Sequence, residues 1–161
     1  MMRCQHCQGV ESHFDQDKAV AKLRLYRKDG PRRTTGWLLA AMESAGVQHA
    51  TVLDVGGGVG VIAWELLRAG ANSAIFTEAS SAYLGVAREE ARRQGVTAHT
   101  RFVHGDFTDV VGEIPKADIV TLDRVICCYP DMQKLVSLSA DKARRLYGIV
   151  YPRDTWWARG C

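Results

Sequence analysis

The sequence predicts an α/β fold in which a mostly parallel sheet of about five strands carries helices on both faces. Short apolar stretches alternate along the chain with longer stretches whose apolar residues recur every three or four positions. The first pattern is typical of buried strands and the second of amphipathic helices. Their alternation favours a parallel sheet, because a helix then carries the chain back before each new strand. A glycine-rich loop directly follows the first strand, where open α/β sheets bind ligands.

The composition is that of an ordinary globular chain of 161 residues, 47% hydrophobic and 24% charged. The net charge of +3 is small and the arginine pairs are scattered, so we expect no nucleic-acid partner. No apolar stretch approaches the roughly 20 residues that span a bilayer, and the first residues lack a signal-peptide core. An odd number of cysteines suits a reducing compartment. These features predict a cytoplasmic protein with no membrane partner.

Two helices are expected before the first strand. The segment 13–30 places Ala19, Leu23 and Tyr26 at helical spacing. The segment 34–46 predicts a second helix that ends at a glycine and has one apolar face. The residues of this face are Trp37, Leu38, Ala41, Met42 and Ala45.

The rest of the chain predicts five strands separated by helices. The strands are expected at 51–55, 73–77, 99–104, 117–123 and 146–152. The helix after the glycine loop stops at Gly70, and the next one begins at a Ser80 cap and ends at Gly95. A further helix is expected over 130–145.

The glycine loop has three possible ligands. It contains four glycines in five positions: Gly56, Gly57, Gly58 and Gly60. A P-loop requires Lys and Ser or Thr after its last glycine, whereas Val61 and Ile62 stand here. A dinucleotide loop requires a small residue where Val61 stands. Asp54, just before the loop, disfavours a pyrophosphate and suits a cationic group, such as the ammonium and sulfonium of S-adenosylmethionine.

The stretch VLDVGGGVG resembles motif I of the class I S-adenosylmethionine-dependent methyltransferases. The resemblance continues in register over about residues 30–152. It implies a Rossmann-like methyltransferase fold and S-adenosyl-L-methionine as the cofactor. It also implies that Asp54 and the four glycines of the loop bind that cofactor.

Three later positions extend the resemblance. Glu78 closes the second strand, where the family's acidic residue accepts from both ribose hydroxyls, and Ala79 would border the adenine. Asp106 resembles the family's acidic residue near the adenine amine, and Phe107 could bond a ring nitrogen through its N–H and pack on the base. Asp123 ends the fourth strand at the edge of the site. Each carboxylate has the alternative of being only a turn residue or a helix cap.

The N-terminal segment is a further part of the resemblance. We divide the chain into a tail and lid helix, 1–30, and an S-adenosylmethionine-binding domain, 31–161. In this family such helices often fold over the cofactor, so Tyr26, Gly30 and Thr34 are expected to touch its methionine end. A helix surface and a hinge are the alternative. The segment is also similar to small-molecule O-methyltransferases of the magnesium-protoporphyrin type.

The expected function is methyl transfer to a small-molecule acceptor. No residue is identified as the catalytic base, and Asp123, Tyr129 and His104 are the candidates. One alternative is a non-catalytic, methyltransferase-like module that binds cofactor or a protein partner. Another is a nicotinamide oxidoreductase, against which Asp54 and Val61 argue.

The two ends of the chain carry the remaining expectations. Cys4 and Cys7 have metal-ligand spacing but make only half of a zinc site, so no metal is expected. The family fold has seven strands, and the residues from Pro152 to Cys161 are too few for the last two. We therefore expect a C-terminally truncated fold whose fifth strand has an open edge, and a possible homo-oligomer through that edge.

Overall fold

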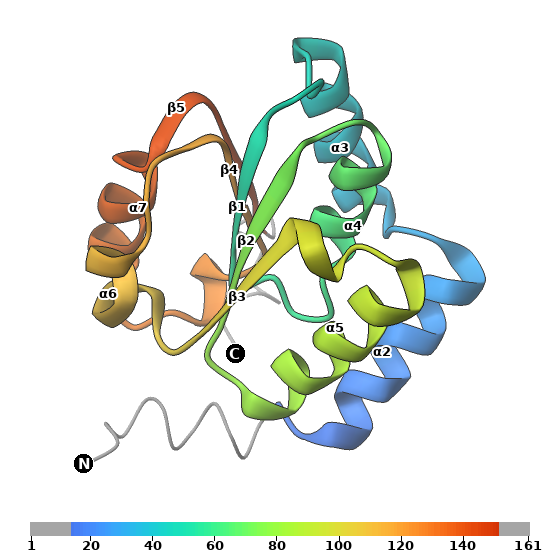
Figure 1. Ribbon diagram of the computed structural model, residues 1–161. Coiled ribbons are helices and arrows are strands. Elements are labelled where there is room, and N and C mark those ends of the chain that lie inside the picture. The colour runs from blue at the N-terminus through green and yellow to red at the C-terminus, as the bar shows by residue number, and fades with distance from the viewer. Residues whose placement is uncertain (1–13, 152–161) are drawn as a thin grey trace.

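A computed structural model describes residues 14–151 and confirms the α/β prediction (Figure 1). Cys4 and Cys7 lie outside these residues. The five strands form one parallel sheet in the order β3-β2-β1-β4-β5. Their bounds are β1 Thr51–Val55, β2 Ser73–Glu78, β3 Thr100–His104, β4 Ala117–Asp123 and β5 Ala143–Val150.

The strand order reverses at β1. From β1 the chain adds β2 and β3 on one side, and then crosses over to add β4 and β5 on the other. The carboxyl ends of β1 and β4 therefore border the point at which open α/β sheets bind ligands. The glycine loop leaves β1 at this point, between Val55 and the helix that begins at Val61.

Helices cover both faces of the sheet (Figure 1). Four of them lie on one side, α2 Gln16–Asp29, α3 Arg33–Ala45, α4 Val61–Arg68 and α5 Ser81–Gln94. On the other side lie α6 Phe107–Val110 and α7 Met132–Ala140. The core accordingly divides into two apolar clusters, one on each face of the sheet. Within residues 14–151, no helix has the length and apolar character needed to cross a bilayer.

Helix α2 packs on the core through the residues that its periodicity predicted. Ala19, Leu23 and Tyr26 are all buried. Beside them the fully buried Glu90 of α5 accepts hydrogen bonds from Arg27 of α2, Nε to Oε2 at 3.0 Å, and from Arg93 of its own helix. Burial raises the pKa of Glu90, but the hydrogen bonds of Arg93, Arg27 and Gln94 outweigh it and hold the pKa at about 2. An ionised Glu90 thus joins α2 to α5.

The predicted apolar face of α3 is confirmed for Met42 and Leu38 and is wrong for its three other residues. Trp37 is 62% exposed, and Ala41 and Ala45 are also exposed. The buried residues are Thr35, Leu39 and Met42, which follow one another at helical spacing. This face packs on β5, where a Cβ at Gly148 would meet the side chains of Met42 and Leu38. Trp37 lies outside it and stacks with the Arg33 guanidinium, 5.0 Å from the ring centroid.

The predicted helix over 130–145 is too long. Helix α7 ends at Ala140, and residues from Ala143 onward form the start of β5. There Ala143 pairs with Ala117 of β4, and the Ala117 N–H donates to the Lys142 carbonyl at 2.9 Å. Pairing along the whole of β4 therefore outweighs the helical propensity of these residues.

Candidate functional site

Three carboxylates lie at one edge of the sheet. Asp54, Glu78 and Asp123 stand at or next to the carboxyl ends of β1, β2 and β4. Carboxyl ends of parallel strands share an edge, so the fold brings together three acids that are far apart in the sequence. The sequence placed them there, and the structure adds their partners.

Asp54 is almost fully buried and only half satisfied. Its Oδ1 accepts from the Thr121 hydroxyl at 3.0 Å. Its Oδ2 is buried and has no hydrogen-bond partner among residues 14–151. Burial raises the pKa of this carboxyl to about 7. The Thr121 hydrogen bond and the backbone N–H of Ala63 lower the pKa, while the charges of Asp123 and Glu78 raise it. A proton or a cationic ligand group would satisfy Oδ2.

Glu78 ties the glycine loop to the end of β2. Its Oε2 accepts from the Gly58 N–H and its Oε1 from the Ser80 N–H, both at 2.9 Å. Burial raises the pKa of Glu78, and the N–H groups of Ser80 and Gly58 act against that shift. Each oxygen retains a second lone pair, so the carboxylate can hold the loop and still accept from a ligand hydroxyl.

The glycine loop leaves no room for side chains at its start. A Cβ at Gly57 would lie 2.4 Å from Cε2 of Phe76 and 2.6 Å from Oδ2 of Asp54. Gly58 has a φ of 62°, in the left-handed region that favours glycine. The loop backbone therefore packs directly against the buried carboxylate of Asp54, and the N–H groups of its glycines donate to Thr77, Gly57 and Glu78.

Asp123 is held from the N-terminal part of the chain. Its Oδ2 accepts from the Thr35 hydroxyl of α3 at 2.7 Å, and Thr35 is 2% exposed. Its Oδ1 is buried and, like Oδ2 of Asp54, lacks a partner in the described part of the chain. The sequence interpretation missed Thr35 and selected its exposed neighbour Thr34. The correct helical phase, set by Leu39 and Met42, would have found it.

Asp106 and Phe107 lie at the end of β3. Asp106 caps α6, and its Oδ1 accepts from the Thr108 N–H at 2.9 Å and from the Tyr129 hydroxyl at 2.7 Å. Phe107 is 4% exposed and its ring belongs to the core on the α6 and α7 face. As the first residue of α6, Phe107 has no helical carbonyl for its N–H.

The two other base candidates are engaged near β3. The Tyr129 hydroxyl contacts Thr108 Oγ1 at 2.9 Å in addition to Asp106. Burial and the Asp106 hydrogen bond raise the pKa of Tyr129 above its ordinary value. The hydroxyl therefore stays protonated at neutral pH and is not available to take a proton. The exposed His104 places Nε2 3.1 Å from the Ala79 carbonyl oxygen. Of the three candidates, only Asp123 is placed beside Asp54 at the strand-order reversal.

The expected lid residues are placed differently from one another. The Tyr26 hydroxyl donates to Glu65 Oε1 of α4 at 2.6 Å, and burial raises its pKa to about 12. This bond directs the Tyr26 hydroxyl to α4 rather than to the three carboxylates at the strand ends. Gly30 ends α2 with a φ of 75°, and Thr34 is exposed in the first turn of α3.

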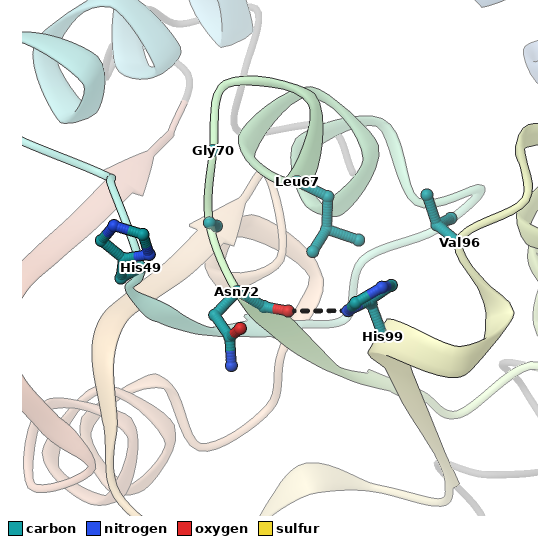
Figure 2. A pocket seen from close by; sticks show the side chains of 7 residues that line it. His49, Leu67, Gly70, Asn72, Val96 and His99 are labelled. Carbon is teal, nitrogen blue, oxygen red and sulfur yellow. Dashed lines mark hydrogen bonds between the residues drawn. The ribbon is translucent and has the colours of Figure 1, made fainter.

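A pocket of about 210 Å³ lies at the other end of the sheet. It is lined by His49, Leu67, Gly70, Ala71, Asn72, Val96 and His99. Figure 2 shows His99 with Nδ1 directed at the Asn72 carbonyl oxygen, 3.1 Å away. His49, Asn72 and His99 come just before β1, β2 and β3, so this pocket is at the amino edge. In residues 14–151, no group of three or more His, Cys, Asp and Glu side chains could hold a metal ion.

Comparisons with known proteins identify the family from one match and the fold from others. Residues 52–146, more than half of the chain, match a family described as "Methyltransferase domain". A search of curated protein sequences found no match. Among solved structures, magnesium protoporphyrin IX methyltransferase of Synechocystis PCC 6803 with bound SAM gives a TM-score of 0.70 at 21% identity, covering 91% of this chain and 76% of that one.

Two other solved structures show the same fold. A proposed RNA methyltransferase from Pyrococcus horikoshii gives a TM-score of 0.63 at 19% identity, over 74% of this chain and 61% of that one. A SAM-dependent methyltransferase from Thiobacillus denitrificans, in complex with S-adenosyl-L-homocysteine, gives a TM-score of 0.57 at 22% identity. The match covers 71% of this chain and 45% of that one. The chain thus spans less than two thirds of the length of these two proteins.

Proposed function

This chain belongs to the methyltransferase domain family, and we propose that it binds S-adenosyl-L-methionine and transfers the methyl group to a small-molecule acceptor. The observation that carries the proposal is a pair of buried oxygens, Asp54 Oδ2 and Asp123 Oδ1, at neighbouring strand ends, neither of which has a partner among residues 14–151. An isolated buried carboxylate is costly unless a cation compensates it. S-adenosylmethionine carries two cationic groups, an ammonium and a sulfonium.

The remaining site residues suit the rest of this cofactor. The lone pairs of Glu78 that the loop leaves available accept the ribose hydroxyls. Ala79 borders the adenine, and Asp106 with the N–H of Phe107 recognises its polar edge. The buried ring of Phe107 argues that its backbone, rather than its side chain, faces the base. The segment with the half-buried Gly30 and the exposed Thr34 remains the proposed lid, whereas the hydrogen bond to Glu65 removes the support for Tyr26.

Methyl transfer requires mainly alignment. The cofactor supplies an activated methyl group, so the chain has to hold the acceptor in line with it and exclude water. Asp123 is the best-placed side chain for this, because the Thr35 hydroxyl holds one oxygen and leaves the other unpartnered. We propose that Asp123 orients the acceptor or takes its proton, and assign no catalytic role to Tyr129 or His104.

Isothermal titration tests the cofactor proposal. We expect S-adenosylmethionine and S-adenosylhomocysteine to bind with a dissociation constant of roughly 1–100 μM, and NAD not to bind. Gly58→Arg should abolish binding, because Gly58 has a positive φ and donates to Glu78. Glu78→Ala should weaken it, because both the loop contact and the ribose contact are lost.

A folded chain that binds neither cofactor form would contradict this proposal. It would favour the alternative of a partner-binding module, and circular dichroism on the same sample establishes that the chain is folded. Cofactor binding without turnover on a broad panel of acceptors would support the non-catalytic module instead. Binding of NAD would favour an oxidoreductase.

We also propose that the chain self-associates through β5. This strand pairs with β4 along one edge, and within residues 14–151 no strand pairs with its other edge. Unpaired edges are templates for pairing with a second chain. Light scattering at micromolar concentration should therefore give twice the mass of the 17.8 kDa chain. A monomer that persists across a concentration series would refute this proposal.

A further inference from the structure

Three basic residues belong to segments next to the carboxylates. Lys22 comes from α2, Arg32 caps the start of α3, and Arg124 directly follows Asp123. All three are exposed, and in the described part of the chain none lies within ion-pair distance of an acid. We call these three residues the basic rim.

The contacts of each segment place the basic rim beside Asp123. Arg32 lies one helical turn before Thr35, whose hydroxyl holds Asp123. Arg124 adopts a φ of 61°, and its N–H donates to the Val150 carbonyl at the end of β5. Although Lys22 is exposed as a whole, partial burial of its amino group and the charges of Arg32 and Arg124 lower its pKa, whereas Glu78 and Asp123 act against this. Lys22 is therefore within electrostatic range of both arginines and of two of the carboxylates.

An apolar groove of about 330 Å³ leads to the basic rim. It is lined by Phe14, Lys18, Ala21, Lys22, Leu25 and Tyr83. Leu25 is 54% exposed, although it is a large apolar side chain. Lys18 is paired with Asp15 at 3.0 Å, whereas the Lys22 amino group stands 5.0 Å from the ring centroid of Tyr83.

The groove lies beside the proposed cofactor site, with the buried Tyr83 between them. Tyr83 forms its inner wall and approaches the glycine loop, since a Cβ at Gly58 would lie 3.8 Å from Cδ1 of Tyr83. The Phe14 carbonyl accepts from the Ser80 hydroxyl at 2.7 Å, next to Glu78. The groove thus adjoins the segment that carries Glu78, and it contains Lys22 of the basic rim.

We propose that this groove and the basic rim bind the methyl acceptor, and that the acceptor is an amphipathic anion. Its apolar body lies against Leu25 and Tyr83, and its acid group meets Lys22, Arg32 and Arg124. This inference rests on the proposed methyl transfer. The α-carboxylate of the cofactor is a single anion, and it uses neither an apolar groove nor three cations.

Fluorescence titration with a matched pair of probes tests the inference. The probes are 1-pyrenebutyrate and its neutral analogue 1-pyrenebutanol, added to the full chain with saturating S-adenosylhomocysteine. We expect the anion to bind more tightly than the alcohol. The affinity for the anion should fall by about three- to tenfold in each of the variants Lys22→Gln, Arg32→Gln and Arg124→Gln. The affinity for the alcohol should not change. Leu25→Asp should weaken both probes.

Lys116→Gln is the control. Lys116 is exposed and precedes β4, so it lies at the opposite edge of the sheet, and its replacement should change neither probe. Equal affinity for the two probes in the unmodified chain would overturn the inference. The inference would also be overturned if the rim variants bound S-adenosylhomocysteine more weakly but bound 5′-methylthioadenosine, which lacks the amino-acid part, as well as the unmodified chain does. The rim would then serve the cofactor carboxylate.

The two proposals fail in different ways. Absence of S-adenosylhomocysteine binding by a folded chain counts against methyl transfer itself. Normal S-adenosylhomocysteine binding with equal affinity for the two probes counts only against the anionic acceptor.

Discussion

Replacement of Asp54 by asparagine is expected to abolish S-adenosylmethionine binding and to stabilise the ligand-free chain at neutral pH. The carboxylate is buried, and its Oδ2 has no partner among residues 14–151. Asparagine keeps an acceptor for the Thr121 hydroxyl and removes the charge that Asp123 and Glu78 repel. The same substitution removes the counter-charge of the cationic ligand group. Asp54→Asn therefore raises the stability of the ligand-free chain and lowers its affinity for the cofactor.

The pH dependence of this effect follows from the raised pKa. Asp54 has an ordinary pKa of 3.8 and a folded-state pKa of about 7. The folded chain therefore holds a proton that the unfolded chain releases, and stability falls as the pH rises from about 4 to about 7. About three pKa units correspond to at most about 4 kcal/mol. Asp54→Asn should gain on the order of 2–4 kcal/mol at pH 8 and little at pH 4.

Urea unfolding at pH 4 and pH 8, with and without S-adenosylhomocysteine, measures both effects. Asp118→Asn is the matched control at the amino end of β4. Its carboxylate accepts from the Thr51 N–H at 2.8 Å, and this bond lowers its pKa, so the same change should destabilise the chain. An Asp54→Asn variant that binds the cofactor as well as the unmodified chain would refute the role of this carboxylate.

Replacement of Gly57 by alanine is expected to destabilise the chain and remove cofactor binding. The added methyl would overlap Phe76, which is fully buried and stacks with Trp64 at a centroid distance of 6.1 Å. It would also press on Oδ2 of Asp54. Because neither neighbour can move freely, the loop has to shift, at a cost of about 1–3 kcal/mol. A shifted loop also loses the hydrogen bond from the Gly58 N–H that positions Glu78.

Gly85→Ala serves as the control for this variant. Gly85 lies inside α5, and a Cβ there meets nothing within 4 Å. Alanine should stabilise the helix by about 0.5–1 kcal/mol and leave binding unchanged. Thermal unfolding and titration with S-adenosylhomocysteine compare the two variants. If Gly57→Ala behaved like Gly85→Ala, the close packing of the loop on Asp54 would be disproved.

The sequence alone determined the sheet and the edge where the candidate site lies. Strands β1, β2 and β4 are short, mostly apolar runs, and the carboxylates Asp54, Glu78 and Asp123 stand in or at the ends of these runs. These patterns are local, and the ends of parallel strands meet by necessity at one edge. The helix caps Ser80 and Gly95 were predictable for the same reason, since a cap depends only on its own turn.

Only the tertiary structure decided which side chains meet across the fold. The Thr35 hydroxyl donates to Asp123, which lies 88 positions later in the sequence. The Tyr26 hydroxyl donates to Glu65, which lies 39 positions later. Trp37 is exposed because packing on β5 sets the rotation of α3, which propensity leaves open. The basic rim forms in the same way, since Lys22, Arg32 and Arg124 belong to three segments. Periodicity describes one element at a time, whereas these contacts depend on how the elements pack together.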